Sequence, residues 1–279
     1  MSGTRFRKVL RESFGNIHRE VKIAFTPLPE PEKWVFLVGC YNSGTTLLAE
    51  MMGRHVDISA LPTEGHFITD QFVKDYDVGL PRMWVNREEL FRLSGDDMGP
   101  DPVRIKKEWG IRLDLKRPVL LEKSPPNSAR TLWLQKHFNN AYFIGIIRNG
   151  YAVAEGIRRK ADPQHLTDSW PIKQCAKQWA RSNDILDEDS HLLENFIWIK
   201  YEDLTERPQE TLEIIAQYLS LPSFPVFNGS ESLSIHEREQ VVKNLNEESL
   251  KRLSSNDISS INDTSASALE KFGYPLMKP

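Results

Sequence analysis

Residues 35–48 read VFLVGCYNSGTTLL: an apolar run, a loop with two glycines, and a second segment whose apolar residues have helical spacing. This pattern predicts a buried strand that leads through the loop into a helix. The first backbone N–H groups of such a helix have no partners within it, and together with the helix dipole they favour a phosphate or sulfate group. The stretch is therefore an expected anion site.

The loop shares its glycine spacing with the phosphate loop of nucleotide triphosphatases but lacks the lysine of that loop. Gly39 and Gly44 match the first part of G-x-x-x-x-G-K-[ST], the loop of nucleotide triphosphatases, in which the lysine reaches the β/γ-phosphates and the hydroxyl holds Mg²⁺. Thr45 stands at the lysine position. Of the lysine and the hydroxyl, only the hydroxyl is therefore present, on Thr46. Glycines in a strand-to-helix turn also serve packing, and the loop alone does not decide the function.

Length and composition limit the classes of protein to consider. The 279 residues suit one large α/β domain or two small ones, and a formal net charge of −3 gives no support for nucleic-acid binding. The two cysteines, Cys40 and Cys175, are too few for a disulfide framework, so a reducing, cytoplasmic location is expected. We find no apolar run of about 18 residues and no signal-peptide core.

Residues 5–25 form a candidate amphipathic helix with a basic polar side. Its apolar face is formed by Phe6, Leu10, Phe14, Ile17 and Val21. Such a helix suits peripheral contact with an anionic membrane, but we favour docking of a terminal helix on the domain. Three prolines in Thr26–Pro31 end the helix. We therefore divide the chain into an amino-terminal helix and linker at 1–33 and a main domain at 34–279.

Further apolar runs predict additional strands, and helical patterns separate several of them. The runs are Val56–Leu61, Pro118–Leu121, Tyr142–Ile147 and Phe196–Ile199. The clearest helical patterns are Ser128–Phe138 and Gln209–Leu219, whereas the serine-rich stretch Ser254–Ser267 is expected to be a surface loop. Continuous apolar strands alternating with helices indicate a three-layer α/β sandwich around a central parallel sheet.

Polar side chains follow the predicted strands at the places where ligands bind in open parallel sheets, beyond the carboxyl ends. They are Glu64, Lys123, Arg148 and Tyr201. Taken singly, Glu64 and Lys123 suit a solvated ion pair, Tyr201 suits a cap on the core, and His66 suits an ordinary loop histidine, although histidine can also act as a base. Together with the glycine loop, they suit transfer of an anionic group from a nucleotide donor to a nucleophile.

Three segments resemble the sulfotransferases that use 3′-phosphoadenosine 5′-phosphosulfate (PAPS). The sequence NSGTTLL at 42–48 resembles the loop that holds the donor's 5′-phosphosulfate. Tyr142–Ala154, with RNGYAV from Arg148, resembles the strand and helix that bind the 3′-phosphate, and YEDL from Tyr201 resembles the segment whose tyrosine lies against the adenine. Weaker similarities at Lys123–Pro125 and Lys271–Tyr274 extend the resemblance over residues 35–274.

The resemblance implies a role for each matching residue. The 5′ side of the donor would be held by Asn42, Ser43, Gly44, Thr45 and Thr46. Arg148 would pair with the 3′-phosphate. Glu64, close to the position of a catalytic glutamate in membrane-type and protein-tyrosine members, would take the proton of an acceptor hydroxyl, with His66 as the alternative base. Lys123 would stabilise the leaving 3′-phosphoadenosine 5′-phosphate (PAP). This chemistry requires no metal.

Two positions depart from the pattern of the resembled family. A lysine or arginine is usual at Asn42, so positive charge on the phosphosulfate has to come from elsewhere, with Lys123 as the candidate. A serine is usual at Gly156, and Arg158 or Arg159 is the candidate replacement. These departures affect the expected donor affinity more than the expected donor.

The leading interpretation is a sulfotransferase that moves a sulfuryl group from PAPS to a hydroxyl or amine of a small molecule, glycan or peptide. A P-loop small-molecule kinase is the first alternative, but the lysine is missing and we find no convincing aspartate after a strand to hold Mg²⁺. A noncatalytic adenosine-bisphosphate-binding protein is the second. Transfer from ATP with Mg²⁺ would favour the kinase, and donor binding without turnover would favour the binding protein.

Overall fold

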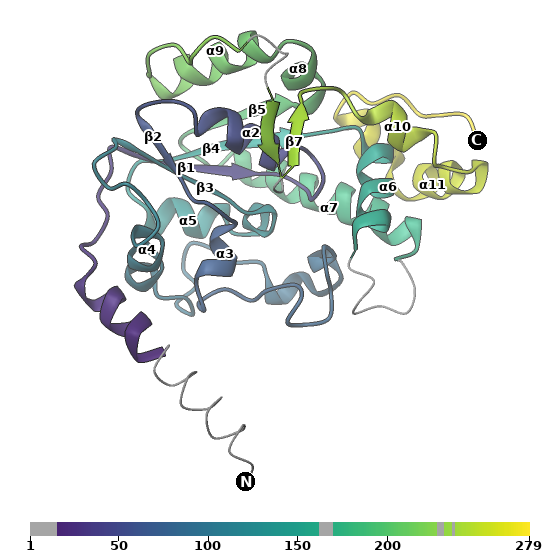
Figure 1. Ribbon diagram of the computed structural model, residues 1–279. Coiled ribbons are helices and arrows are strands. Elements are labelled where there is room, and N and C mark those ends of the chain that lie inside the picture. The colour runs from purple at the N-terminus through teal and green to yellow at the C-terminus, as the bar shows by residue number, and fades with distance from the viewer. Residues whose placement is uncertain (1–15, 162–169, 228–231, 236–237) are drawn as a thin grey trace, which may run out of the picture.

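The computed structural model describes residues 16–161, 170–227, 232–235 and 238–279. A five-stranded, wholly parallel sheet lies between two layers of helices (Figure 1). The strands are β1 (Lys33–Val38), β2 (Ile58–Ala60), β3 (Val119–Lys123), β4 (Ala141–Ile147) and β5 (Phe196–Lys200), in the spatial order β2-β3-β1-β4-β5. The expected three-layer sandwich is confirmed.

Strand β1 lies at the centre of the sheet, with β3 on one side and β4 on the other. Its side chains alternate between the faces, as the pleat requires. Val35 and Leu37 pack in the cluster formed by α2 (Thr45–Met52), α8 (Tyr201–Glu206) and α9 (Pro208–Leu219). Trp34 and Phe36 pack on the opposite face with α4 (Pro102–Gly110) and α5 (Thr131–His137). The strand order reverses beside β1, where α/β sheets form a crevice.

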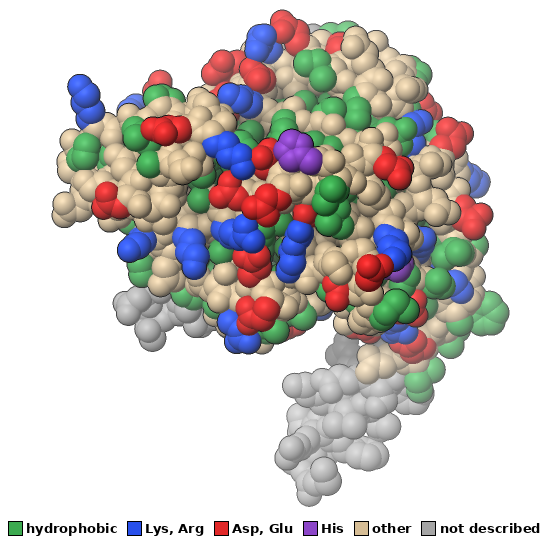
Figure 2. All heavy atoms as spheres, turned by 180° about the vertical axis from the view of Figure 1, so that it is seen from behind, with side chains coloured by type: hydrophobic (Ala, Val, Ile, Leu, Met, Phe, Trp, Pro, Cys, Tyr) green, Lys and Arg blue, Asp and Glu red, His purple; other side chains and the backbone are tan. Residues whose placement is uncertain are grey.

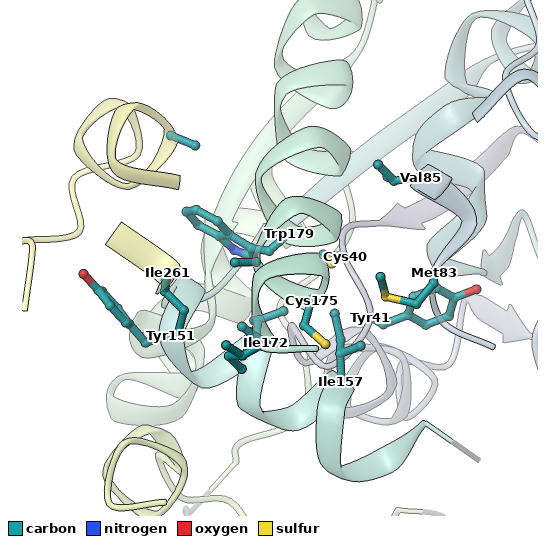
Figure 3. Close-up of a cluster of buried hydrophobic side chains, with 14 of the residues drawn as sticks. Cys40, Tyr41, Met83, Val85, Tyr151, Ile157, Ile172, Cys175, Trp179 and Ile261 are labelled. Carbon is teal, nitrogen blue, oxygen red and sulfur yellow. The ribbon is translucent and has the colours of Figure 1, made fainter. Parts of the chain in front are cut away.

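A third cluster joins three further helices beside this sheet. It includes residues of α6 (Gly150–Lys160), α7 (Ile172–Ser190) and α11 (Ser255–Lys271), and Figure 3 shows Cys40, Cys175 and Trp179 within it. Both cysteines are free thiols and buried. The other elements are α3 (Gly65–Ile68), η1 (Trp84–Leu90), η2 (Pro125–Ala129), α10 (Asn246–Leu250) and the hairpin of β6 (Ser232–Ile235) and β7 (Arg238–Val241).

The expected loop at Ser254–Ser267 is wrong, because helix α11 begins at Ser255 and continues to Lys271. The Ser254 hydroxyl accepts a hydrogen bond from the Asp257 N–H, and the Asp257 carboxylate accepts one from the Ser254 N–H, which forms a capping box. Ile258 and Ile261 lie on the buried face of the helix. The high serine content concealed this amphipathic pattern.

Two other elements differ in length from the prediction. The strand expected at Val56–Leu61 is restricted to β2, because Val56 lies in a turn and is 74% exposed. The helix expected at Ser128–Phe138 is divided into η2 and α5 at Arg130, whose φ of −133° and ψ of 12° are not helical. The remaining strands and α9 agree with the prediction to within about two residues at their ends.

Residues 16–25 are helical and dock on the domain through a charged residue. The Arg19 guanidinium lies 3.1 Å from an Asp70 carboxylate oxygen and 2.7 Å from one of Glu108. Ile17 and Val21, from the expected apolar face, are 60% and 48% exposed. Phe6, Leu10 and Phe14 lie outside the described residues. The division of the chain into an amino-terminal part at 1–33 and a main domain at 34–279 stays a prediction.

Charged side chains are interspersed over the face seen in Figure 2, with no extended patch of one sign. None of the helices in the described ranges combines the length and the apolar character needed to cross a bilayer.

Candidate active site

The predicted site residues meet at the carboxyl ends of the strands. Lys123 ends β3 opposite Leu37 of β1, and Ile147 at the end of β4 lies opposite Lys200 of β5. Arg148 and Tyr201 follow these last two strands directly, and the glycine loop follows β1. Parallel register therefore brings segments from four strands to one edge of the sheet.

The two loop glycines allow close approach of the loop to its neighbours. Gly44 has φ of 100°, and a Cβ there would lie 2.6 Å from the ring of Tyr201. Gly39 has φ of 150°, and a Cβ would lie 2.4 Å from the carbonyl oxygen of Ile146. The Gly39 N–H donates to Ser128 Oγ over 2.9 Å. The start of α2 is thereby held at the sheet edge, as the anion site requires.

Arg148 is buried beside this loop, with 8% of its surface exposed. Its Nε donates to Asn246 Oδ1 (2.7 Å), its Nη1 donates to the carbonyl oxygen of Asn42 (3.0 Å), and its guanidinium lies 4.1 Å from the ring centroid of Tyr201. Burial lowers the pKa of Arg148. Nη2 is buried without a hydrogen-bond partner among the described residues. A guanidinium in this state is suited to binding an anion.

Tyr201 is 3% exposed, and its ring lies between Gly44 and the Arg148 guanidinium. Its hydroxyl donates to the carbonyl oxygen of Lys243 and accepts from the N–H of Leu245, both over 3.2 Å. The ring therefore fixes the positions of the loop and of Arg148. Its contact with an adenine stays a prediction.

Glu64 and Lys123 form an ion pair beside the helix start. Lys123 Nζ lies 2.8 Å from Glu64 Oε1 and donates to Thr46 Oγ1 over 3.2 Å. The side chains of Glu64 and Lys123 are only 19% and 12% exposed. The ion pair that the residue types suggested is present, but it lies in the site and not in open solvent. Lys123 links the candidate base to the glycine loop.

His66 is fully buried directly behind this pair. Its Nδ1 lies 3.1 Å from Ser124 Oγ and 3.6 Å from Glu64 Oε2. Burial, together with the nearby Arg130 and Lys123 cations, holds the pKa of His66 well below its usual range, so the imidazole is neutral. Because Glu64 is 19% exposed and His66 is fully buried, Glu64 is the more accessible of the two candidate bases.

A buried carboxylate, Glu122, supports the segment that carries Glu64 and His66. It accepts hydrogen bonds from the Gly65 N–H (2.9 Å), the Ser124 hydroxyl and Asn127 Nδ2 (2.7 Å). Burial raises the pKa of Glu122 to about 7. Sequence analysis did not identify this residue, although it directly precedes Lys123.

Glu122 predicts a dependence of stability on pH. Between about pH 4.5 and pH 7 the native carboxyl is protonated while that of the unfolded chain is ionised, so this group lowers the free energy of unfolding as pH rises. The full loss is about 3 kcal/mol at most. We expect Glu122→Gln to gain stability relative to the wild type between pH 5 and pH 7.5, measured by urea unfolding, with the exposed Glu247→Gln as control. Parallel stability curves for wild type and Glu122→Gln would contradict the assignment.

The departure at Asn42 is accompanied by a cation that sequence analysis missed. Arg82 Nη1 donates to Asn42 Oδ1 over 3.4 Å. Lys123, the candidate named from the sequence, hydrogen-bonds to Thr46 and Glu64. Arg82 lies in the segment between α3 and η1, where the sequence shows no motif.

The candidates for replacing a serine at Gly156 are both engaged with carboxylates. Arg158 Nη1 lies 2.7 Å from Asp257 Oδ1, and Arg159 Nε lies 2.9 Å from Glu155 Oε1. A Cβ at Gly156 would lie 3.2 Å from the Cβ of Asn42. The two departures, distant in sequence, are therefore neighbours in space.

Three known sulfotransferases are similar to this chain in sequence or in fold. Protein-tyrosine sulfotransferase A of Caenorhabditis elegans is 23% identical over 261 residues, which cover 86% of this chain and 67% of that protein. The sulfotransferase domain of the Synechococcus PCC 7002 olefin synthase superposes with a TM-score of 0.58 at 16% identity, covering 90% of this chain and 98% of that domain. Sulfotransferase STF9 of Mycobacterium avium superposes with a TM-score of 0.57 at 14% identity, covering 95% and 82%.

The profile of the sulfotransferase family matches residues 35–225. The matched range contains the glycine loop, Glu64, Lys123, Arg148 and Tyr201. The chain belongs to the sulfotransferase family.

Proposed function

We propose that this sulfotransferase takes its sulfuryl group from PAPS and transfers it to a hydroxyl or amine of its acceptor. The main support is the set of polar atoms around the glycine loop. Arg148 Nη2, Ser43 Oγ and Asn42 Nδ2 are all buried without hydrogen-bond partners in the described part of the chain. Buried polar groups in proteins are normally paired. Three such groups together, one of them cationic, support an anionic ligand at this place.

Donor binding is divided between two parts of the sheet edge in this proposal. The backbone N–H groups at the start of α2 and the hydroxyls of Thr45 and Thr46 bind the 5′-phosphosulfate. Arg148 binds the 3′-phosphate with its free nitrogen, and Tyr201 keeps that guanidinium beside the loop. These residues supply positive charge to the donor without a metal.

Glu64 is the proposed general base. Its carboxylate removes the acceptor proton as the acceptor oxygen attacks sulfur in line with the departing phosphate oxygen. Lys123 stabilises the negative charge that develops on that phosphate oxygen. The contacts of Lys123 with Glu64 and Thr46 support this division of roles, because they place the ammonium between the base and the loop. The low exposure of His66 makes it the less suitable base.

The acceptor in this proposal is a small molecule, a glycan or a peptide. Trp84 and Trp109 are completely buried and belong to the core, so neither offers aromatic surface to an acceptor. The relative from Caenorhabditis elegans is named a protein-tyrosine sulfotransferase, so tyrosine peptides belong in the acceptor screen beside phenols and sugars.

The free thiols of Cys40 and Cys175 support a reducing, cytoplasmic location. Peripheral membrane contact through residues 5–25 remains part of the proposal.

Calorimetric titration with PAP tests the donor, with 5′-AMP and ATP as comparison ligands and without added metal. We expect micromolar binding of PAP, and a loss of about 10- to 100-fold in Arg148→Ala, because hydrogen bonds from a buried guanidinium to phosphate are lost. The weaker binding of 5′-AMP, which lacks the 3′-phosphate, should not change in this variant. Arg207→Ala, at an exposed arginine between α8 and α9, is the matched control.

Two results would contradict the proposed donor. One is the absence of PAP binding by the wild-type protein, and the other is a preference for ATP with Mg²⁺. PAP binding without turnover across the acceptor screen would favour a noncatalytic binding protein.

A further inference from the structure

The segment that carries Arg82 is held against the glycine loop through Asp75 and Met83. The Arg82 backbone N–H donates to Asp75 Oδ2 over 2.7 Å, and the same oxygen accepts from the Tyr41 hydroxyl over 2.7 Å. Met83 is completely buried, and Figure 3 shows it beside Tyr41. The segment that carries Arg82 is therefore anchored on a residue of the loop itself.

The backbone of Arg82 has an unusual conformation. Its φ is 63°, in the left-handed region that residues other than glycine, asparagine and aspartate seldom adopt, and Asn42 has φ of 62°. Conformations of this kind persist where the surroundings impose them, and they are concentrated at ligand sites. The hydrogen bond from the Arg82 N–H to Asp75 is such a constraint.

The Arg82 guanidinium is directed toward the loop. It lies 5.7 Å from the ring centroid of Tyr41, and its Nη1 reaches Asn42 Oδ1. Its Nε is buried without a hydrogen-bond partner within the described ranges, and so is Asn42 Nδ2. Arg148 contacts the same loop residue from another side, through the Asn42 carbonyl oxygen. Asn42 thus lies between two guanidinium groups, each with an unused nitrogen.

Lys160 is a third cation, close enough to interact electrostatically with Arg82 and Arg148. Burial lowers the pKa of Lys160 to about 8, with further lowering by Arg82, Arg159 and Arg148 and an opposing effect of Glu155. Positive charge therefore accumulates on this side of the loop, whereas residues 39–46 contain no lysine or arginine.

We propose that Arg82 supplies the glycine loop with the cation it lacks and binds the 5′-phosphosulfate of the donor. Gly156 leaves room for the side chain of Asn42, since a Cβ there would lie 3.2 Å from the Asn42 Cβ. The Arg82 guanidinium reaches the amide of Asn42 from a separate segment. This assignment rests on the proposed function, because it requires PAPS as donor. The assignment makes Arg82 a donor-binding residue that lies outside the glycine-loop segment of the sequence.

The test compares PAP and 5′-AMP binding in Arg82→Gln. Both ligands carry the 5′-phosphate, so we expect Arg82→Gln to weaken both by about tenfold or more, whereas Arg148→Ala weakens PAP selectively. Arg87→Gln, in which the lost guanidinium pairs with Glu89 on the surface, is the control and should bind both ligands as the wild type does. In Arg82→Gln, the further change Asn42→Lys returns a cation to the loop and should recover most of the lost affinity.

The outcomes separate this inference from the proposed function. Absence of PAP binding by the wild type would overturn both. Wild-type binding with unchanged affinities in Arg82→Gln would overturn only the role of Arg82. If Arg82→Gln does not fold, Arg82→Lys decides: a loss of about three- to tenfold is expected because an ammonium cannot reproduce the guanidinium geometry. An unchanged affinity would overturn the assignment.

Discussion

Replacing Glu64 with glutamine is expected to lower kcat by about 10²- to 10⁴-fold, the usual contribution of a general base. Glutamine keeps the size of the side chain but cannot accept the acceptor proton. PAP affinity should change little, because no proposed donor contact involves the Glu64 carboxylate. The measurement is initial-rate kinetics with an acceptor found in the screen, combined with calorimetric titration of PAP.

Two further variants make the Glu64 experiment decisive. Glu50→Gln changes an exposed carboxylate on α2 and should retain full activity. His66→Gln tests the alternative base at the position 3.6 Å from Glu64 Oε2. If Glu64→Gln turns over normally and His66→Gln does not, the roles of the two residues must be exchanged.

Lys123→Met is expected to reduce kcat by about 10²- to 10³-fold, the range typical for removal of one group that stabilises developing negative charge. Methionine retains an unbranched apolar chain but loses the ammonium that contacts Glu64 and Thr46. Thr46 and the backbone N–H groups still hold the donor, so the effect should appear in kcat more than in KM. Lys116→Met, outside the site, is the control.

The double variant Glu64→Gln, Lys123→Met provides a check on the ion pair. Residues in direct contact give non-additive effects. We therefore expect the combined loss of kcat to be smaller than the product of the two single losses. A fully multiplicative loss would mean that the 2.8 Å contact does not couple the base to the ammonium during turnover.

The sheet was predictable because its strands carry continuous apolar runs. Val35–Val38 and Phe143–Ile147 are buried on both faces, and such segments differ clearly from amphipathic helices. Helix α11 was not recognised because its buried positions include Ser265 and Ala268, which are weak signals of an apolar face. The capping box at Ser254 and Asp257 was the readable signal.

The candidate site was predictable where a residue ends a strand or directly follows one. Lys123, Arg148 and Tyr201 could be placed at one edge because parallel strands share their direction. Arg82 and Asn246 could not be placed, since each reaches the site from an irregular segment or a short helix far away in sequence. Only tertiary contacts bring such residues together.

The central position of β1 affects how the chain folds during synthesis. Both neighbours of this strand come later in the chain, and β4 ends roughly 110 residues after it, so translation at about 5–20 residues per second leaves one edge of β1 unpaired for about 5–20 s. Unpaired apolar edges can associate with other chains. Nascent chains released before Ile147 should therefore aggregate or remain bound to chaperones, whereas chains that include β4 can complete the centre of the sheet.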